Sequence, residues 1–121
     1  MADSGKDNIW KIRTIKSYPE ATNHLLVGRV LDITDSYVRL HCRTYHFGSA
    51  VAGPEDIQIG NVMVRVVPWS RIEIINELPD AFDYARSTLI ANKEGQVLFQ
   101  DGKHACAIGS SSRTCTCQVK Y

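Results

Sequence analysis

Hydrophobic and polar residues alternate most regularly between residues 37 and 47. Small and apolar side chains occupy every second position of this segment: Val38, Leu40, Cys42 and Thr44. Larger polar and aromatic side chains occupy the positions between them, from Tyr37 to Phe47. Successive side chains of a β-strand point to opposite faces, so a period of two predicts a strand with one buried face. We therefore expect a strand over residues 37–47.

Two earlier segments also indicate strands. Residues 10–17 mix β-branched and charged residues until Pro19 interrupts the pattern, which predicts a strand. A short helix is the alternative, because three residues would share one helical face: Ile9, Ile12 and Lys16. Residues 25–33 predict a second strand, and Gly28 inside it indicates the kind of bend or bulge that curves a small barrel.

Turn signals separate these strands from two later ones. Residues 34–36 (Thr-Asp-Ser) predict a turn, and residues 48–61, with their Gly-Pro pair, predict a long loop. Residues 62–67 and 71–75 predict two strands around a tight turn at Pro68, because proline has no N–H to donate to a neighbouring strand. Five strands between residues 9 and 79 predict one small, twisted β-barrel.

The remaining residues predict a β-rich extension over residues 80–121. One helical turn capped by Asp80 is expected first. Three short strands follow in a meander, over residues 88–91, 96–100 and 103–108, and Asp101-Gly102 is a strong signal for a two-residue hairpin. Residues 113–121 fit either a last strand or a loose tail, and the polar residues 1–8 predict a flexible tail.

Composition restricts the classes of function. Hydrophobic residues make up 44% of the 121 residues and charged residues 22%, which is typical of a folded domain. The 14 Lys and Arg residues and 13 Asp and Glu residues give a formal net charge of +1. Because this charge exerts no general attraction on phosphate polymers, a nucleic-acid site would have to be a local patch. No grouping resembles a catalytic constellation or a phosphate-binding glycine loop, so we do not expect an enzyme.

The apolar stretches and the cysteines bear on the expected location. No apolar stretch approaches the roughly 18–20 residues that span a bilayer, and the first residues lack a signal-peptide pattern, so we expect a soluble cytoplasmic protein. Four unevenly spaced cysteines predict reduced thiols. A zinc site is an alternative for four residues, His104, Cys106, Cys115 and Cys117. The Cys-x-Cys spacing fits ordinary packing of a strand better, and we expect no metal and no cofactor.

Two segments resemble the motifs of the Sm and LSm (Sm-like) proteins. Residues 28–40 (GRVLDITDSYVRL) are similar to the first motif of the family, and residues 62–75 (VMVRVVPWSRIEII) to the second. The resemblance implies an SH3-like five-stranded barrel, assembly into homo-oligomeric rings through the fourth strand of one subunit and the fifth of the next, and binding of single-stranded RNA. The residues after Asp35 do not include the family's base-reading Asn, and Pro68-Trp69 replaces its usual Arg-Gly pair. A scaffold protein that keeps the ring without the nucleotide pocket is the alternative function.

Aromatic rings and cations alternate on the polar side of residues 37–47. This arrangement suits single-stranded RNA, because rings stack on bases and cations follow phosphates. The predicted RNA-binding residues are Tyr37, Arg39, His41 and Arg43, together with Arg65 and Arg71. The alternative is that this row, which continues to Tyr45 and Phe47, is buried against the extension or another subunit.

Residues 62–67 carry apolar side chains on both faces, which would be hazardous on a free sheet edge. Ring closure removes such edges. The predicted subunit interface therefore contains six residues: Val62, Val64, Val66, Trp69, Ile72 and Ile74. For Trp69 the alternative role is a plug at the open end of the barrel.

Overall fold

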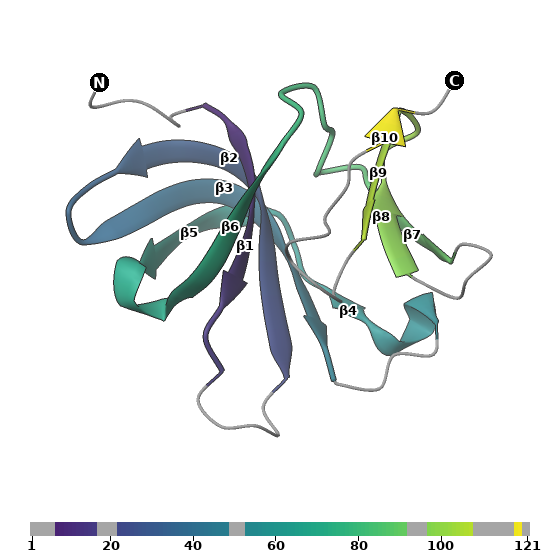
Figure 1. Ribbon diagram of the computed structural model, residues 1–121, viewed down its shortest axis with the longest axis horizontal. Helices are drawn as coiled ribbons and strands as arrows, with labels where there is room; N and C mark the ends of the chain where they lie inside the picture. The colour runs from purple at the N-terminus through teal and green to yellow at the C-terminus, as the bar shows by residue number, and fades with distance from the viewer. Residues whose placement is uncertain (1–6, 17–21, 49–52, 92–96, 108–117, 120–121) are drawn as a thin grey trace.

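The computed structural model describes residues 7–16, 22–48, 53–91, 97–107 and 118–119. These residues form two antiparallel sheets, which lie on opposite sides of the view in Figure 1. The first sheet contains β1 (Ile9–Thr14), β2 (Asn23–Ile33), β3 (Tyr37–Phe47), β4 (Gln58–Ile59), β5 (Met63–Pro68) and β6 (Ile72–Leu78). The second contains β7 (Thr88–Ala91), β8 (Val97–Gln100), β9 (His104–Ala107) and β10 (Gln118–Val119). The described ranges also contain two 3-10 turns, η1 (Pro54–Asp56) and η2 (Trp69–Arg71).

The first sheet is strongly curved but open. Its strand order is β4-β3-β2-β1-β6, and β5 pairs with β3 beside β4. The turn η2 connects β5 to β6, yet no ladder joins these two strands within the described ranges. The prediction of a mainly β fold is confirmed, whereas the five predicted strands form a sheet that is not closed into a barrel.

The strand predictions hold with small shifts at the ends. Residues 9–14 form β1 rather than the alternative helix, and β3 has the predicted bounds. The segment 48–61, expected to be a loop, contains η1 and the two-residue strand β4 in its described part. Strand β4 forms because Tyr45 and His46 of β3 offer it a partner. The short segment therefore depends on a contact distant in sequence.

Gly28 permits a close approach of β2 and β3. It lies opposite Cys42 in an uninterrupted part of the ladder, while the register shift falls later, between Val30 and Asp32. A Cβ atom at Gly28 would collide with the carbonyl oxygen of His41 and with the backbone of Cys42. The bulge predicted at Gly28 is therefore displaced, and the glycine serves a packing role.

Alternating residues of β2 bury both faces of the first sheet. Leu26 faces a core enclosed by the curved sheet, together with Trp10, Ile12, Val30, Val38, Leu40, Cys42 and Val67. Leu25 and Val27 face a second core between the two sheets, whose other members include Ile9, Tyr45, Phe47, Leu78, Phe82, Tyr84, Val97 and Phe99. Figure 1 shows the second sheet beside the β3 and β4 end of the first. The extension is therefore packed on the first sheet.

The hairpin between β8 and β9 is present where Asp101-Gly102 predicted it. Gly102 adopts a φ of 95°, and the backbone N–H of Asp101 donates to the carbonyl of His104 at 3.1 Å. The Asp101 carboxylate accepts backbone N–H groups from Lys103 at 2.9 Å, His104 at 2.7 Å and Asp83 at 2.9 Å. Burial raises the pKa of Asp101, but these donors outweigh burial and lower the pKa from 3.8 to about 2.

Three other predictions for the extension have different outcomes. Residues 80–86 form turns rather than the predicted helical turn. In the region expected to be a strand or a tail, β10 pairs with β9, and most of residues 113–121 lie outside the described residues. The tail predicted for residues 1–8 likewise falls mostly outside them.

The prediction that all cysteines are reduced is wrong for Cys106, which is fully buried and disulfide-bonded. Cys42 is free and buried, and burial raises the pKa of its thiol. Among the described residues, no helix has the length and apolar character that a membrane crossing requires.

Candidate anion-binding pocket

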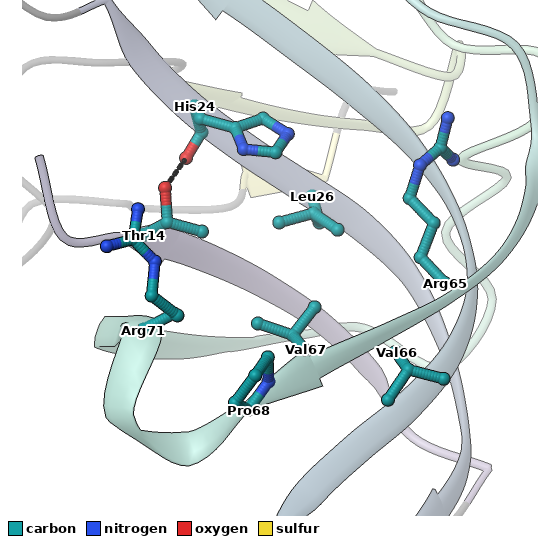
Figure 2. Close-up of a pocket in the computed structure, with 8 residues that line it drawn as sticks. All are labelled: Thr14, His24, Leu26, Arg65, Val66, Val67, Pro68 and Arg71. Atoms are coloured by element: carbon teal, nitrogen blue, oxygen red, sulfur yellow. Dashed lines mark hydrogen bonds between the residues drawn. The ribbon is translucent and has the colours of Figure 1, made fainter. Parts of the chain in front are cut away.

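A pocket of about 340 Å³ opens beside β5 of the first sheet. Figure 2 shows its walls, which come from β1, β2, β5 and η2. The lining residues are Thr14, His24, Leu26, Arg65, Val66, Val67, Pro68 and Arg71. Their positions in the sequence span most of the first sheet, so the pocket exists only after β1, β2 and β5 have assembled.

The turn η2 brings Arg71 to the pocket. Here the chain reverses after Pro68, and the backbone N–H of Ile15 donates to the carbonyl of Arg71 at 2.8 Å. The guanidinium Nη2 of Arg71 donates in return to the carbonyl of Ile15 at 3.2 Å. These two bonds place Arg71 beside the end of β1.

The register of β3 and β5 directs Arg65 toward the same face of the sheet as Val67. Arg65 lies opposite Leu40, and Val67 lies opposite Val38, and both partners are buried in the enclosed core. Nη1 of Arg65 donates to the carbonyls of Cys42 at 3.1 Å and Asn61 at 3.2 Å.

The two guanidinium groups keep donors free for a ligand. Within the described part of the chain, Nε and Nη2 of Arg65 make no hydrogen bond, because its contacts all use Nη1. In the same ranges, the side-chain hydrogen bond of Arg71 uses Nη2. Arginine offers five N–H donors in a planar fork, so each residue can bind an anion without losing its own anchor.

His24 contributes a neutral imidazole ring. The ring stacks on that of His46, with centroids 4.2 Å apart and an interplanar angle of 13°. Burial is the largest cause that lowers the pKa of His24 from 6.5 to about 4, followed by the charges of His46, Arg65 and Arg71. Its buried Nε2 atom has no hydrogen-bond partner among the described residues.

The lining combines positive charge with an apolar surface. None of the lining residues is acidic. Apolar wall is supplied by Leu26, Val66, Val67 and Pro68. Charge and apolar surface together suit an anion that carries an apolar body, because the guanidinium groups bind the charge and the wall covers the rest.

The predicted RNA-binding residues divide between two faces of the first sheet. Arg65 and Arg71 line the pocket. The remaining four belong to the opposite face of β3, where Arg39 is exposed and Tyr37 is partly exposed. Of the six predicted residues, Arg65 and Arg71 are the pair that this pocket brings together.

The second half of the β3 row is covered by the extension. Nδ1 of His41 and the hydroxyl of Tyr84 lie 2.7 Å apart, and Arg43 donates to the carbonyl of Ser87 at 3.0 Å. The Tyr45 hydroxyl lies 2.8 Å from the Ser87 hydroxyl, and burial raises its pKa. The packing alternative considered from the sequence is thus present from His41 onward.

The predicted interface residues also divide into two groups. Val64 and Val66 are 48% and 54% exposed on β5, and their neighbour Met63, which the sequence analysis did not select, is 52% exposed. Val62 packs against the core between the sheets. Trp69, Ile72 and Ile74 are partly buried, the first two of them against the enclosed core.

Trp69, a predicted interface residue, packs at the turn η2. Its indole N–H donates to the carbonyl of Thr34 at 2.7 Å, and its backbone N–H donates to the carbonyl of Ser36 at 3.2 Å. Because these bonds tie η2 to the turn between β2 and β3, Trp69 acts as a structural anchor at that end of the sheet.

Sequence analysis missed the contributions of Thr14 and His24. His24 follows a turn-rich stretch, and no periodic signal marks a polar residue at a strand start as part of a pocket. Within the described ranges, no group of three His, Cys, Asp or Glu residues is arranged to hold a metal ion.

Comparison with known proteins adds no relative to these observations. No protein-family model, curated protein or solved structure matches the chain.

Proposed function

We propose that this chain is a non-catalytic, Sm-like β protein whose copies assemble into a ring. Support for the Sm-like part comes from the succession along the chain of five longer strands, β1, β2, β3, β5 and β6, and from the 3-10 turn η2 between the last two. The two motifs of the resemblance lie on β2, β3, β5 and β6. In this proposal the open sheet is completed by a neighbouring subunit rather than by a ladder within the chain.

The exposed edge of β5 is the observation that carries this proposal. Met63, Val64 and Val66 are each about half exposed, on a strand whose only partner among the described strands is β3. Soluble proteins rarely leave such an apolar edge uncovered, because its free N–H and C=O groups recruit other strands. Strand β6 is the opposite edge of the sheet, with β1 as its described partner. Pairing of β5 with β6 of another copy is a heterologous contact, which forms a ring when the rotation between neighbouring copies closes.

Light scattering coupled to size-exclusion chromatography tests the assembly. The wild-type mass should be several times 13.5 kDa. Val66→Lys should reduce the mass, since a lysine on an edge strand opposes pairing with another strand. Ile15→Lys is the matched control, because Ile15 is 42% exposed but lies outside β5. A monomeric wild type would contradict the proposal, as would equal effects of the two lysine variants.

Binding of single-stranded RNA is a second proposed function. It is favoured by the paired guanidinium groups of Arg65 and Arg71 and by the exposed Arg39. Fluorescence anisotropy with oligo-U and oligo-A at several salt concentrations should detect salt-dependent binding. Arg39→Ala should weaken it and reduce the slope of log affinity against log salt by about 0.7 if the side chain contacts one phosphate.

The control for RNA binding is Arg86→Ala, because Arg86 is exposed on the extension. Arg43 is unsuitable as a test position, since its bond to Ser87 contributes to packing. No binding at micromolar protein and low salt would contradict the RNA proposal. A ring that binds no RNA would leave the scaffold alternative as the function.

A further inference from the structure

We propose that the pocket between β2, β5 and η2 binds a small organic oxyanion, meaning a carboxylate or phosphate group carried on an apolar or aromatic body. This inference is tested separately from ring assembly, because its two cations, Arg65 and Arg71, are not among the exposed apolar residues of β5, although Val66 belongs to both the pocket lining and that edge. It also differs from RNA binding, since one discrete ligand occupies the site.

Size is the first argument. The volume of about 340 Å³ falls within the range of small-molecule sites, at its lower end. An RNA strand instead needs a groove that continues past several nucleotides. The pocket is therefore suited to a ligand about as large as one nucleotide or one aromatic acid.

Charge is the second argument. Arg65 and Arg71 contribute two guanidinium groups, and no acidic residue belongs to the lining. Each guanidinium is anchored through one nitrogen to a backbone carbonyl, so its orientation is held before a ligand arrives. A preorganised donor loses less conformational entropy on binding, which raises the affinity for the anion. Apolar side chains of β5 cover the rest of the ligand.

The unpartnered Nε2 atom of His24 is the third argument. Among the described residues, four buried side-chain polar atoms have no hydrogen-bond partner, and His24 Nε2 is the one that belongs to a residue of the pocket lining. A water, an ion or a functional role can account for such an atom. Figure 2 shows the imidazole ring of His24 between the guanidinium groups of Arg71 and Arg65. Because Nε2 is buried, an oxygen of the ligand would accept a hydrogen bond from it only after the imidazole ring rotates toward the pocket.

Binding should respond to pH through this histidine. The charged or titratable groups that act on His24 are His46 from β3, Arg65 from β5 and Arg71 from η2. Electrostatic interaction with these groups disfavours protonation of His24, whereas a bound anion favours it. An anion whose own charge is constant should consequently bind more tightly as the pH falls from 7 to 5.

Isothermal titration calorimetry of the full-length chain tests the proposal with four probes. Uridine monophosphate represents phosphate esters and benzoate represents carboxylates, while benzenesulfonate keeps its charge over the pH range. Inorganic phosphate lacks an apolar body and should bind about tenfold more weakly than the best organic probe, which is the effect of losing roughly 1.4 kcal/mol of apolar contact. Preference for uridine monophosphate or for benzoate identifies the source of the oxyanion.

Substitutions at the pocket sharpen the test. Arg71→Gln should weaken the best organic probe about tenfold, because a charge-assisted hydrogen bond is lost. Arg65→Lys is a second variant, which keeps the charge and removes the planar fork. Arg86→Gln is the control and should leave the affinity unchanged. His24→Gln should abolish the tightening of benzenesulfonate binding at low pH.

Three outcomes would overturn the proposal. The first is failure of every organic probe to bind at concentrations up to about 10 mM, an affinity too weak for a preorganised site. The second is an equal loss of binding in Arg71→Gln and Arg86→Gln. The third is binding of oligo-U without binding of any small probe, which would indicate a polymer surface. Ring assembly is measured separately by mass, so its failure would not affect these outcomes.

Discussion

Acidification should destabilise this protein through His24. In the folded chain the pKa of His24 is lowered from 6.5 to about 4, first by burial and then by the charges of His46, Arg65 and Arg71. At a pH between 6.5 and about 4, the His24 ring binds a proton in the unfolded chain but not in the folded chain. Stability therefore rises with pH in this window and is lost as the pH falls through it.

The magnitude follows from the difference between the two pKa values. Lowering the pKa of His24 from 6.5 to about 4 corresponds to a contribution of about 3 kcal/mol to the free energy of unfolding. About 2 kcal/mol of this contribution would be lost between pH 7 and pH 5. The ring is partly accessible to solvent, which screens the neighbouring charges. We therefore expect a loss of about 1 kcal/mol over this interval from His24 itself.

Urea denaturation of the wild type and of His24→Gln at pH 7 and pH 5 isolates this effect, because other titrating groups contribute to both proteins. Between pH 7 and pH 5, the free energy of unfolding of the wild type should fall by about 1 kcal/mol more than that of the variant. An NMR titration of the His24 ring in the folded protein should give a pKa near 4. Identical pH dependence in the two proteins, or a ring that titrates near 6.5, would refute this reasoning.

Three further substitutions test the packing around the site by urea denaturation. Phe99→Ala should lower the free energy of unfolding by about 4 kcal/mol, because its ring is fully buried between the sheets; a loss below about 1 kcal/mol would contradict a shared core. Gly28→Ala should cost about 3 kcal/mol through collision with β3, while Gly48→Ala, which has open space around it, should cost nothing; equal losses would contradict the steric argument. Asp101→Ala should cost about 2 kcal/mol at pH 7 by removing a carboxylate that accepts backbone N–H groups. Because the pKa of Asp101 is lowered to about 2, this difference should persist to about pH 4 and then shrink; a difference unaffected by acid would contradict it.

The strands could be predicted because their signals are local. Strand β3 has the predicted bounds, and β7 matches residues 88–91, since alternation of side chains is a property of consecutive residues. The Asp101-Gly102 hairpin was equally accessible, because the turn depends on a glycine with positive φ. Predictions were least accurate in loops, where β4 forms only because β3 offers a partner.

The pocket could be predicted only in part. Arg65 and Arg71 were selected from the sequence as cations, but nothing local indicated that they share a pocket with His24. Their meeting depends on the register of β5 against β3 and on the reversal of the chain at η2. The sequence left two alternatives open for the aromatic and cationic row of β3, since the segment that covers its second half lies about 40 residues later in the chain.

By itself, the sequence determined a mainly β chain, most strand positions and the inward-facing residues of β3, because periodicity and turn chemistry act between neighbouring residues. Tertiary structure decided that the first sheet remains open, that the extension packs on it, and that Cys106 is disulfide-bonded. It also placed two arginines and a neutral histidine around one pocket. These features depend on contacts between residues far apart in the chain, and a linear pattern of hydrophobic and polar positions does not specify such contacts.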